Sequence, residues 1–235
     1  MPSNNEKRDQ APFKVPVSCI ADFVSSPGRT PESLIRPYKF GKRGEGAARS
    51  SYYRHAINAI RLYHGGGRDP SVFQVALAAL QKKAEGAKEK TDRVKCEKNM
   101  VAIGLYQRVY MNRDFRVLPN HRIAYRLGQV RITAQPDLWV EENGTQVLLK
   151  IGVARKQSSY IDVLLTIMRK AAVSSGHKRV RAKNVIYLNV STGEEMICRG
   201  GLTRFNRTFR AITREIARAW PNVAPKPAAG GAPAA

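Results

Sequence analysis

Cysteines, acidic residues and long apolar runs are all scarce in this sequence of 235 residues. The three cysteines, Cys19, Cys96 and Cys198, lie far apart, and none forms a CxxC or Cys/His pair with the spacing of zinc ligands. This spacing argues against a disulfide framework and against a structural zinc site. We expect the three thiols to be reduced and buried.

Membrane-spanning and secretory patterns are also missing from the sequence. No stretch approaches the ~18 consecutive apolar residues of a membrane span. Residues 1–13 are polar and lack the apolar run of a signal peptide. We therefore expect an intracellular, cytoplasmic protein of bacterial origin, with no membrane partner.

The shortage of acidic residues leaves a large positive charge. Lys and Arg number 41, Asp and Glu number 18, and the formal net charge is +23. A charge of this size attracts polyanions over long distances. Nucleic acid is the first candidate partner and an anionic membrane surface the second. Hydrophobic residues make up 43% of the chain, which predicts a folded core and not a disordered basic tail.

The composition divides the chain into four segments. Residues 1–12 are polar and predict a disordered N-terminus, while residues 221–235 are rich in Pro, Ala and Gly and predict a disordered tail. Residues 13–90 predict a helical N-terminal region, because apolar residues recur there at helical spacing. Residues 91–220 predict an α/β core that ends in a basic helix.

The hydrophobic period changes within this core segment. Asn143-Gly144 separates two strand-like runs and predicts a tight hairpin between them. The expected elements, in order, are a helix at 96–110, strands at 115–127, 129–142 and 145–154, a helix at 157–172, strands at 183–190 and 194–200, and a helix at 201–220. The order is therefore α-β-β-β-α-β, followed by a strand and a helix.

Pro136-Asp137 lies at the centre of this order and is followed by the hairpin sequence VEENG. Over residues 97–190 the chain resembles the PD-(D/E)XK nuclease superfamily. The resemblance implies an α/β fold with a restriction-endonuclease-like αβββαβ core, here with an N-terminal helical region and a C-terminal basic helix. In that family the third strand carries an acid and, two residues later, a lysine. An acid on the first helix often joins them, and Glu97 occupies that place here.

The family's chemistry explains these residue types. Carboxylates hold Mg²⁺ through oxygen ligands, the metal polarises the phosphate and generates hydroxide, and the lysine neutralises charge in the transition state. The resemblance therefore implies a remnant catalytic site of Asp137, Lys150 and Glu97. Asp137 and Glu97 would hold Mg²⁺ only if the site is active.

The third strand, VLLKIGVARK, departs from the family pattern and allows two registers. The first places Lys150 at the acid position and Gly152 at the lysine position, and the second places Leu148 at the acid position and Lys150 at the lysine position. Side chains two residues apart share one face of a strand, so Lys150 points at the site in either register.

We favour the first register because the strand is apolar through Leu149. An ammonium at a ligand position repels a divalent cation, so we expect Lys150 to pair with Asp137 and expect no cofactor. The second register retains Glu97, Asp137 and Lys150 and leaves weak Mg²⁺ binding open.

Basic side chains are concentrated in several places. On the last helix, arginines recur every three or four residues, opposite an apolar face formed by Phe205, Phe209, Ile212, Ile216 and Trp220. Arginine forks match phosphate geometry. The residues expected to contact nucleic acid are Arg204, Arg207, Arg210, Arg214 and Arg218 of this helix, Lys178, Arg179 and Arg181 before the fourth strand, Lys39, Lys42 and Arg43 near the N-terminus, and Arg155 and Lys156 after the third strand.

These observations favour a nucleic-acid-binding protein with a nuclease-like fold and a degenerate catalytic site, which grips the phosphate backbone of DNA or RNA. One alternative is an active Mg²⁺-dependent phosphodiesterase with a rearranged site. Another is a basic structural subunit of a nucleoprotein or protein complex. Cleavage assays separate the first two, and the salt dependence of binding separates direct phosphate contacts from the third.

Overall fold

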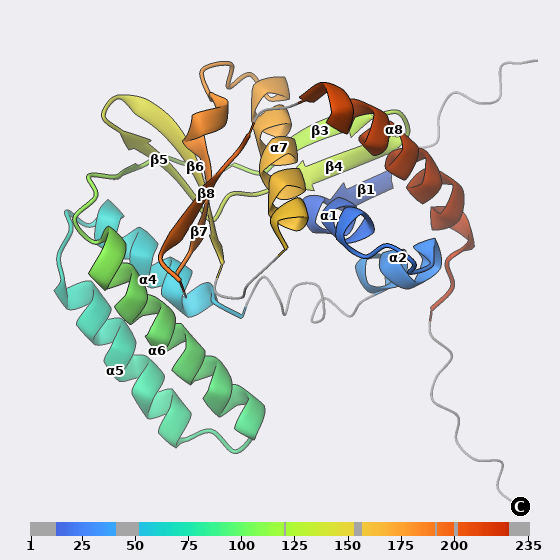
Figure 1. Ribbon diagram of the computed structural model, residues 1–235. Coiled ribbons are helices and arrows are strands. Elements are labelled where there is room, and N and C mark those ends of the chain that lie inside the picture. The colour runs from blue at the N-terminus through green and yellow to red at the C-terminus, as the bar shows by residue number, and fades with distance from the viewer. Residues whose placement is uncertain are drawn as a thin grey trace, which may run out of the picture.

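The computed structural model shows a mixed α/β protein with two mixed sheets. Among the residues it describes, seven α-helices surround these sheets (Figure 1). No helix in this part of the chain is long and apolar enough to span a membrane. The structure describes residues 13–40, 52–119, 121–152, 157–190, 192–199 and 202–225.

The larger sheet has five strands in the order β2-β5-β6-β7-β8. β5 and β6 are antiparallel and joined at Asn143-Gly144, where φ is 49° and 71°, as the predicted hairpin turn requires. β7 is parallel to β6, and helix α7 (Ser158–Ser174) connects them. The strands are β2 Arg116–Val117, β5 Leu138–Glu142, β6 Thr145–Gly152, β7 Val185–Asn189 and β8 Glu194–Ile197.

The smaller sheet has the order β1-β4-β3, with β1 parallel and β3 antiparallel to β4. Its strands are β1 Phe13–Pro16, β3 Ile123–Leu127 and β4 Val130–Ala134. Two predictions are wrong here. The predicted helical region begins with a strand, and the run 129–142 is divided between two sheets. Pro136 has no backbone N–H to continue a ladder, which favours the break between β4 and β5.

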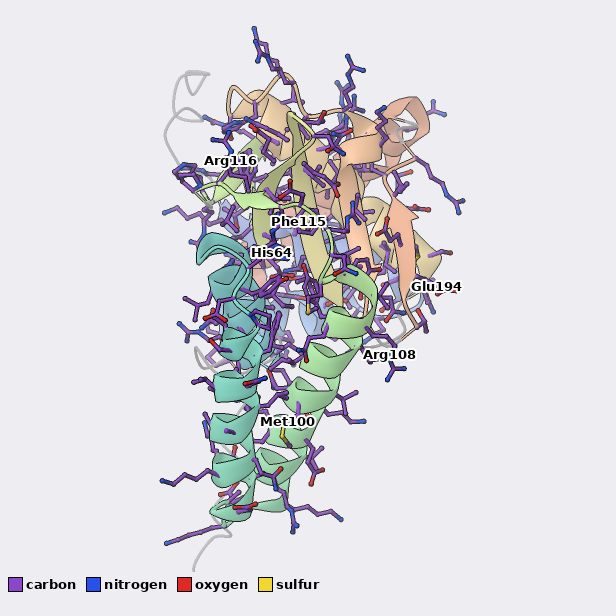
Figure 2. All side chains as sticks on the ribbon, turned by 90° about the vertical axis from the view of Figure 1, so that its left-hand side faces the viewer. His64, Met100, Arg108, Phe115, Arg116 and Glu194 are labelled. Carbon is purple, nitrogen blue, oxygen red and sulfur yellow. The ribbon has the colours of Figure 1, made fainter. Side chains whose placement is uncertain are left out.

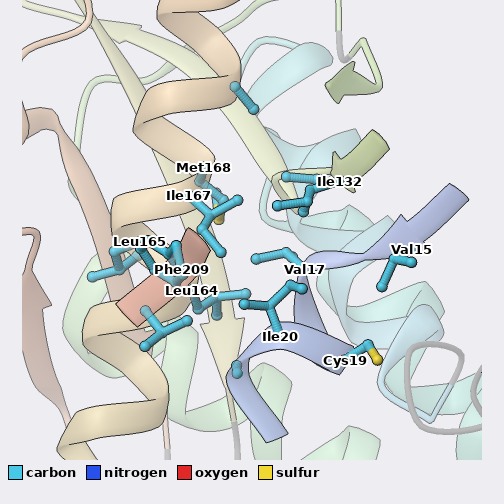
Figure 3. Close-up of a cluster of buried hydrophobic side chains, with 14 of the residues drawn as sticks. Val15, Val17, Cys19, Ile20, Ile132, Leu164, Leu165, Ile167, Met168 and Phe209 are labelled. Carbon is cyan, nitrogen blue, oxygen red and sulfur yellow. The ribbon is translucent and has the colours of Figure 1, made fainter. Parts of the chain in front are cut away.

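Helix α7 lies between the two sheets and carries much of the core. Its residues 163–168 are all buried, so the predicted amphipathic helix is apolar on nearly every side. Figure 3 shows Leu164, Ile167 and Met168 of α7 close to Val17 and Ile20, which belong to helix α1 (Val17–Ser25). The smaller sheet and α1 cover the side of α7 that turns away from the larger sheet, which is why this helix has no broad polar face.

The opposite face of the larger sheet is covered by helices α4 (Arg54–Gly65), α5 (Ser71–Glu85) and α6 (Lys90–Tyr110) (Figure 1). Residues 13–90 therefore do not pack as a unit of their own. Helices α1 and α2 (Pro31–Lys39) join the α7 layer, whereas α4 and α5 pack with α6.

The chain after helix α8 (Leu202–Ala219) is held by α2. Lys39 Nζ donates to the carbonyl of Val223 at 3.0 Å, Arg36 Nε donates to that of Ala224 at 3.1 Å, and Val223 is buried. The predicted disordered tail is therefore wrong for residues 221–225. Residues 1–12 and 226–235, also predicted to be disordered, lie outside the described residues.

A buried histidine of α4 contacts α6 and the segment just before β2. His64 Nε2 is 2.8 Å from the hydroxyl of Tyr106, and its ring lies 5.0 Å from that of Phe115 (Figure 2). Burial, helped by the nearby charge of Arg68, lowers the pKa of His64 to about 4. His64 is therefore neutral in the folded protein at neutral pH.

Shortening Leu165 on α7 should destabilise the protein strongly. Leu165 is fully buried, and Leu165→Ala should cost about 2–5 kcal/mol of unfolding free energy in a urea titration because it leaves a cavity. Val173→Ala, on the exposed side of the same helix, should change it by no more than about 0.5 kcal/mol. Equal effects of the two substitutions would contradict the central position of α7.

His64 should make folding stability depend on pH. Its pKa is about 4 in the fold and about 6.5 in an unfolded chain. The unfolded chain therefore binds the proton more readily. The stability that the neutral side chain contributes is complete above pH ~6.5 and is lost as the pH falls toward ~4. His64→Gln should remove this part of the acid destabilisation, which urea titrations on either side of this window measure. A difference between variant and wild type that does not change with pH would contradict the lowered pKa.

Candidate functional site

Asp137 lies immediately before β5, and its backbone N–H, its carbonyl and its carboxylate are all hydrogen-bonded. Its backbone N–H donates to the carbonyl of Leu149 at 2.8 Å, and its own carbonyl accepts from Arg61 Nε of α4 at 2.7 Å. Its carboxylate accepts from Lys150 Nζ at 2.9 Å and from the backbone N–H of Ile151 at 2.8 Å. Both carboxylate oxygens therefore have a donor.

The predicted pairing of Lys150 with Asp137 is confirmed by this geometry. Leu138 pairs with Leu149 in the β5–β6 ladder, so Asp137 lies opposite Lys150 and on the same face. The side chains of the pair are only 14% and 27% exposed for Asp137 and Lys150. An ion pair that is partly removed from water is screened less by salt than a surface pair.

Gly152 and Tyr187 occupy the neighbouring positions on this face. A Cβ atom at Gly152 would lie 1.7 Å from the hydroxyl oxygen of Tyr187, so the tyrosine fills the space of any side chain there. In the favoured register, Gly152 stands where the family has its lysine. Burial, and then the negative charge of Asp137, raises the pKa of Tyr187 to about 12. The neutral hydroxyl of Tyr187 therefore occupies the space that a side chain at position 152 would need.

Glu97 does not join Asp137 and Lys150. Its carboxylate is half exposed and pairs with Arg93 one turn earlier on α6, at 3.5 Å. Helix α6 packs on the sheet face that carries Leu149 and the rest of the second hydrophobic cluster, whereas Lys150 alternates to the other face. The prediction that the helix acid completes the site is therefore wrong, because its helix covers the opposite side of the sheet.

The residues at Asp137 do not fit a Mg²⁺ site. Magnesium is bound through oxygen ligands in near-octahedral geometry, and the ammonium of Lys150 lies 2.9 Å from one of the two carboxylate oxygens. Within the described ranges, no group of three or more His, Cys, Asp or Glu side chains could hold a metal ion. The carboxylate of Asp137 instead binds the ammonium of Lys150 and the backbone N–H of Ile151.

The arginine face of α8 is present where the structure describes it. Phe209, Ile212 and Ile216 are buried, as predicted. The side chain of Arg204 lies outside the described residues. The exposed arginines on the other side of the helix are Arg207, Arg210, Arg214 and Arg218.

The second basic cluster lies in the loop between α7 and β7. Lys178, Arg179 and Arg181 are exposed there. The loop is anchored by His177, whose ring lies 4.3 Å from that of Trp139. A surface depression of about 350 Å³ opens beside it, lined by Gln146, Gly176, His177, Lys178 and Arg179.

The other predicted contacts have different outcomes. Lys39 is half-buried and holds the chain after α8 through main-chain carbonyls, which gives it a structural role. Lys42, Arg43, Arg155 and Lys156 lie outside the described residues.

Sequence reasoning placed Gly152 in the region around Asp137 but missed Arg61 and Tyr187. Arg61 lies four residues after the buried Ile57, beside the apolar face of its helix. This spacing could have indicated that its side chain faces the sheet. Tyr187 lies in a strand whose residues are all buried, and nothing in the sequence marks its contact with Gly152. Their contact depends on the pairing of β6 with β7, which no local pattern encodes.

A scan against protein-family models finds no match. A search of curated proteins also finds none. Among solved structures, a chain titled "Crystal structure of SSO0001" aligns with a TM-score of 0.35 and 13% sequence identity, over 74% of this chain and 76% of that chain. A likeness this weak supports no conclusion about function.

Adding a methyl group at Gly152 should destabilise the protein. Gly152→Ala forces the Tyr187 ring or the strand to move, and overpacking of this kind costs about 1–3 kcal/mol in a urea titration. Gly104→Ala is the matched control, because nothing lies within 4 Å of a Cβ at this helical glycine. It should stabilise the protein by about 0.5–1 kcal/mol. If both substitutions stabilise the protein, Tyr187 does not occupy this space.

Proposed function

We propose that this protein binds nucleic acid through its basic surface and has a restriction-endonuclease-like core whose catalytic centre is degenerate. The observation that carries the proposal is the 2.9 Å ion pair between Lys150 and Asp137. A cation stands beside the aspartate where the nuclease family places a second metal-binding acid, in the register favoured above.

The sheet topology supports the finer statement about the fold. β5 and β6 form the hairpin after Pro136-Asp137, α7 follows, and β7 returns parallel to β6. This is the β-β-α-β part of the expected order. The smaller sheet contributes β3 and β4 as an additional hairpin before it.

The distribution of charge supports the binding role. Residues 115–136 contain no acid, 143–193 contain only Asp162, and 196–235 contain only Glu215. These segments contain β3 and β4 of the smaller sheet, β2, β6 and β7 of the larger sheet, and helices α7 and α8. Most of the excess positive charge therefore lies in these segments, and the exposed cations of α8 and of the loop between α7 and β7 would attract a polyanion.

Three acids of β5 and β8 are engaged within the protein. Arg113 binds Glu142 at 2.7 Å and Glu195 at 2.5 Å, and Arg116 binds Glu141 at 2.8 Å. These pairs tie β2, β5 and β8 together and neutralise this region locally.

The protein should bind short labelled duplex DNA or single-stranded RNA and leave it intact. Fluorescence anisotropy should show affinity falling log-linearly with salt concentration, with a slope of about −0.9 per duplex phosphate contacted, because binding releases counterions. Incubation of the same probes with Mg²⁺ or Mn²⁺ should yield no cleavage products on denaturing gels.

Asp137→Ala and Asp92→Ala provide the control pair for the cleavage assay. Asp92 is an exposed carboxylate on α6. Cleavage by the wild type that disappears in Asp137→Ala but persists in Asp92→Ala would establish the active nuclease and overturn the degenerate centre. Failure of the wild type to bind any of the probes at low salt would overturn nucleic-acid binding and favour a basic subunit that contacts protein.

A further inference from the structure

We propose that the nucleic-acid backbone follows one continuous basic track, which ends at the depression beside His177 and avoids the Asp137–Lys150 pair. The track is formed by Arg207 and Arg210 of α8, Lys170 of α7, and Lys178 and Arg179 of the following loop. The proposal deepens the proposed function, on which it rests, by locating the phosphate-binding surface.

The first step of the track leads from α8 to α7. Arg207 and Arg210 are exposed and one turn apart, so they share a face of α8. Burial, and then the nearby charge of Arg210, lowers the pKa of Lys170. α8 begins next to the C-terminal end of α7 (Figure 1). An anion at this point would relieve the repulsion between the two side chains.

The second step leads from Lys170 to the loop. Lys170 Nζ lies 5.4 Å above the ring of Tyr125 on β3. The neighbouring Ala124 donates its backbone N–H to Ser175 Oγ at 3.5 Å. β3 and the end of α7 therefore lie side by side, and Lys170 and the loop belong to one surface.

The loop is fixed in place by its backbone. His177 donates its N–H to the carbonyl of Ala172 at 3.0 Å, and Val180 donates to the carbonyl of His177 at 3.1 Å. The ring of His177 packs on the buried Trp139. Lys178 and Arg179 are thus presented from a held turn, which reduces the entropy lost when they bind a ligand.

The depression at the end of the track suits a backbone phosphate. Its lining residues include Lys178, Arg179 and Gln146, and none of them is acidic. Arg offers a bidentate fork and Lys a point charge, the two donor types that proteins use for phosphate. Charge complementarity therefore selects an anionic backbone as the occupant.

The track and the Asp137–Lys150 pair lie apart along the same strand. Gln146 lines the depression, and Lys150 follows it by four residues on β6. At about 3.3 Å per residue this separates them by about 13 Å. A backbone held in the track would therefore pass the remnant centre without entering it.

Two double substitutions test the track, and a third controls for net charge. Lys170→Ala/Arg210→Ala and Lys178→Ala/Arg179→Ala each remove two charges from it. Lys82→Ala/Lys83→Ala removes two charges from exposed positions on α5. With labelled duplex DNA and single-stranded RNA, each track variant should bind about tenfold more weakly and lower the salt slope by about 2. The control should stay within about twofold at physiological salt, because distant charges are screened.

The outcomes separate this proposal from the one on which it rests. If the wild type binds neither probe, nucleic-acid binding itself is wrong. If the wild type binds and the control variant loses as much affinity as the track variants, the surface is non-specific and the track is wrong. Weakening by only one track pair would overturn its continuity. Thermal melting of each variant checks folding, and the exposed pair Lys178 and Arg179 keeps the test decisive if Lys170→Ala/Arg210→Ala does not fold.

Discussion

The burial of α7 between two sheets is the constraint on which most of this structure depends. A helix covered on both sides must be apolar nearly all round, and residues 163–168 meet that demand. The helix also connects the parallel strands β6 and β7 and packs against β7, β3 and β4. Positively charged side chains lie toward its C-terminal end, at Lys170, and in the following loop at 176–179.

The sheet then separates two kinds of charge. On the α7 side, Lys150 and Asp137 neutralise each other, and cations predominate beyond them. At β2, β5 and β8 of the larger sheet, Arg113 and Arg116 form ion pairs with glutamates. Lys and Arg also outnumber Asp and Glu in the segment that contains α4–α6, but residues 115–136, 143–193 and 196–235 supply most of the net charge of +23.

Local patterns predicted much of this fold. Helical spacing located α4 and α6, the Asn143-Gly144 turn located the β5–β6 hairpin, and alternation placed Lys150 beside Asp137. Long-range pairing was beyond the sequence. Phe13–Pro16 is a strand because β4 lies beside it, and Glu97 misses the site because α6 packs on the other face of the sheet. Neither partner lies close in the chain, so no local period could reveal it.

The contact between Gly152 and Tyr187 has a consequence for redesign. Replacing Lys150 by an acid would recreate a possible metal ligand but not the lysine two residues later, because the tyrosine already fills that volume. Tyr187 is itself part of the core beneath α7, so making room for a lysine would require repacking that layer. Installing both the acid and the lysine of the nuclease pattern would therefore take several coordinated substitutions, and a single change at Lys150 or Gly152 would not suffice.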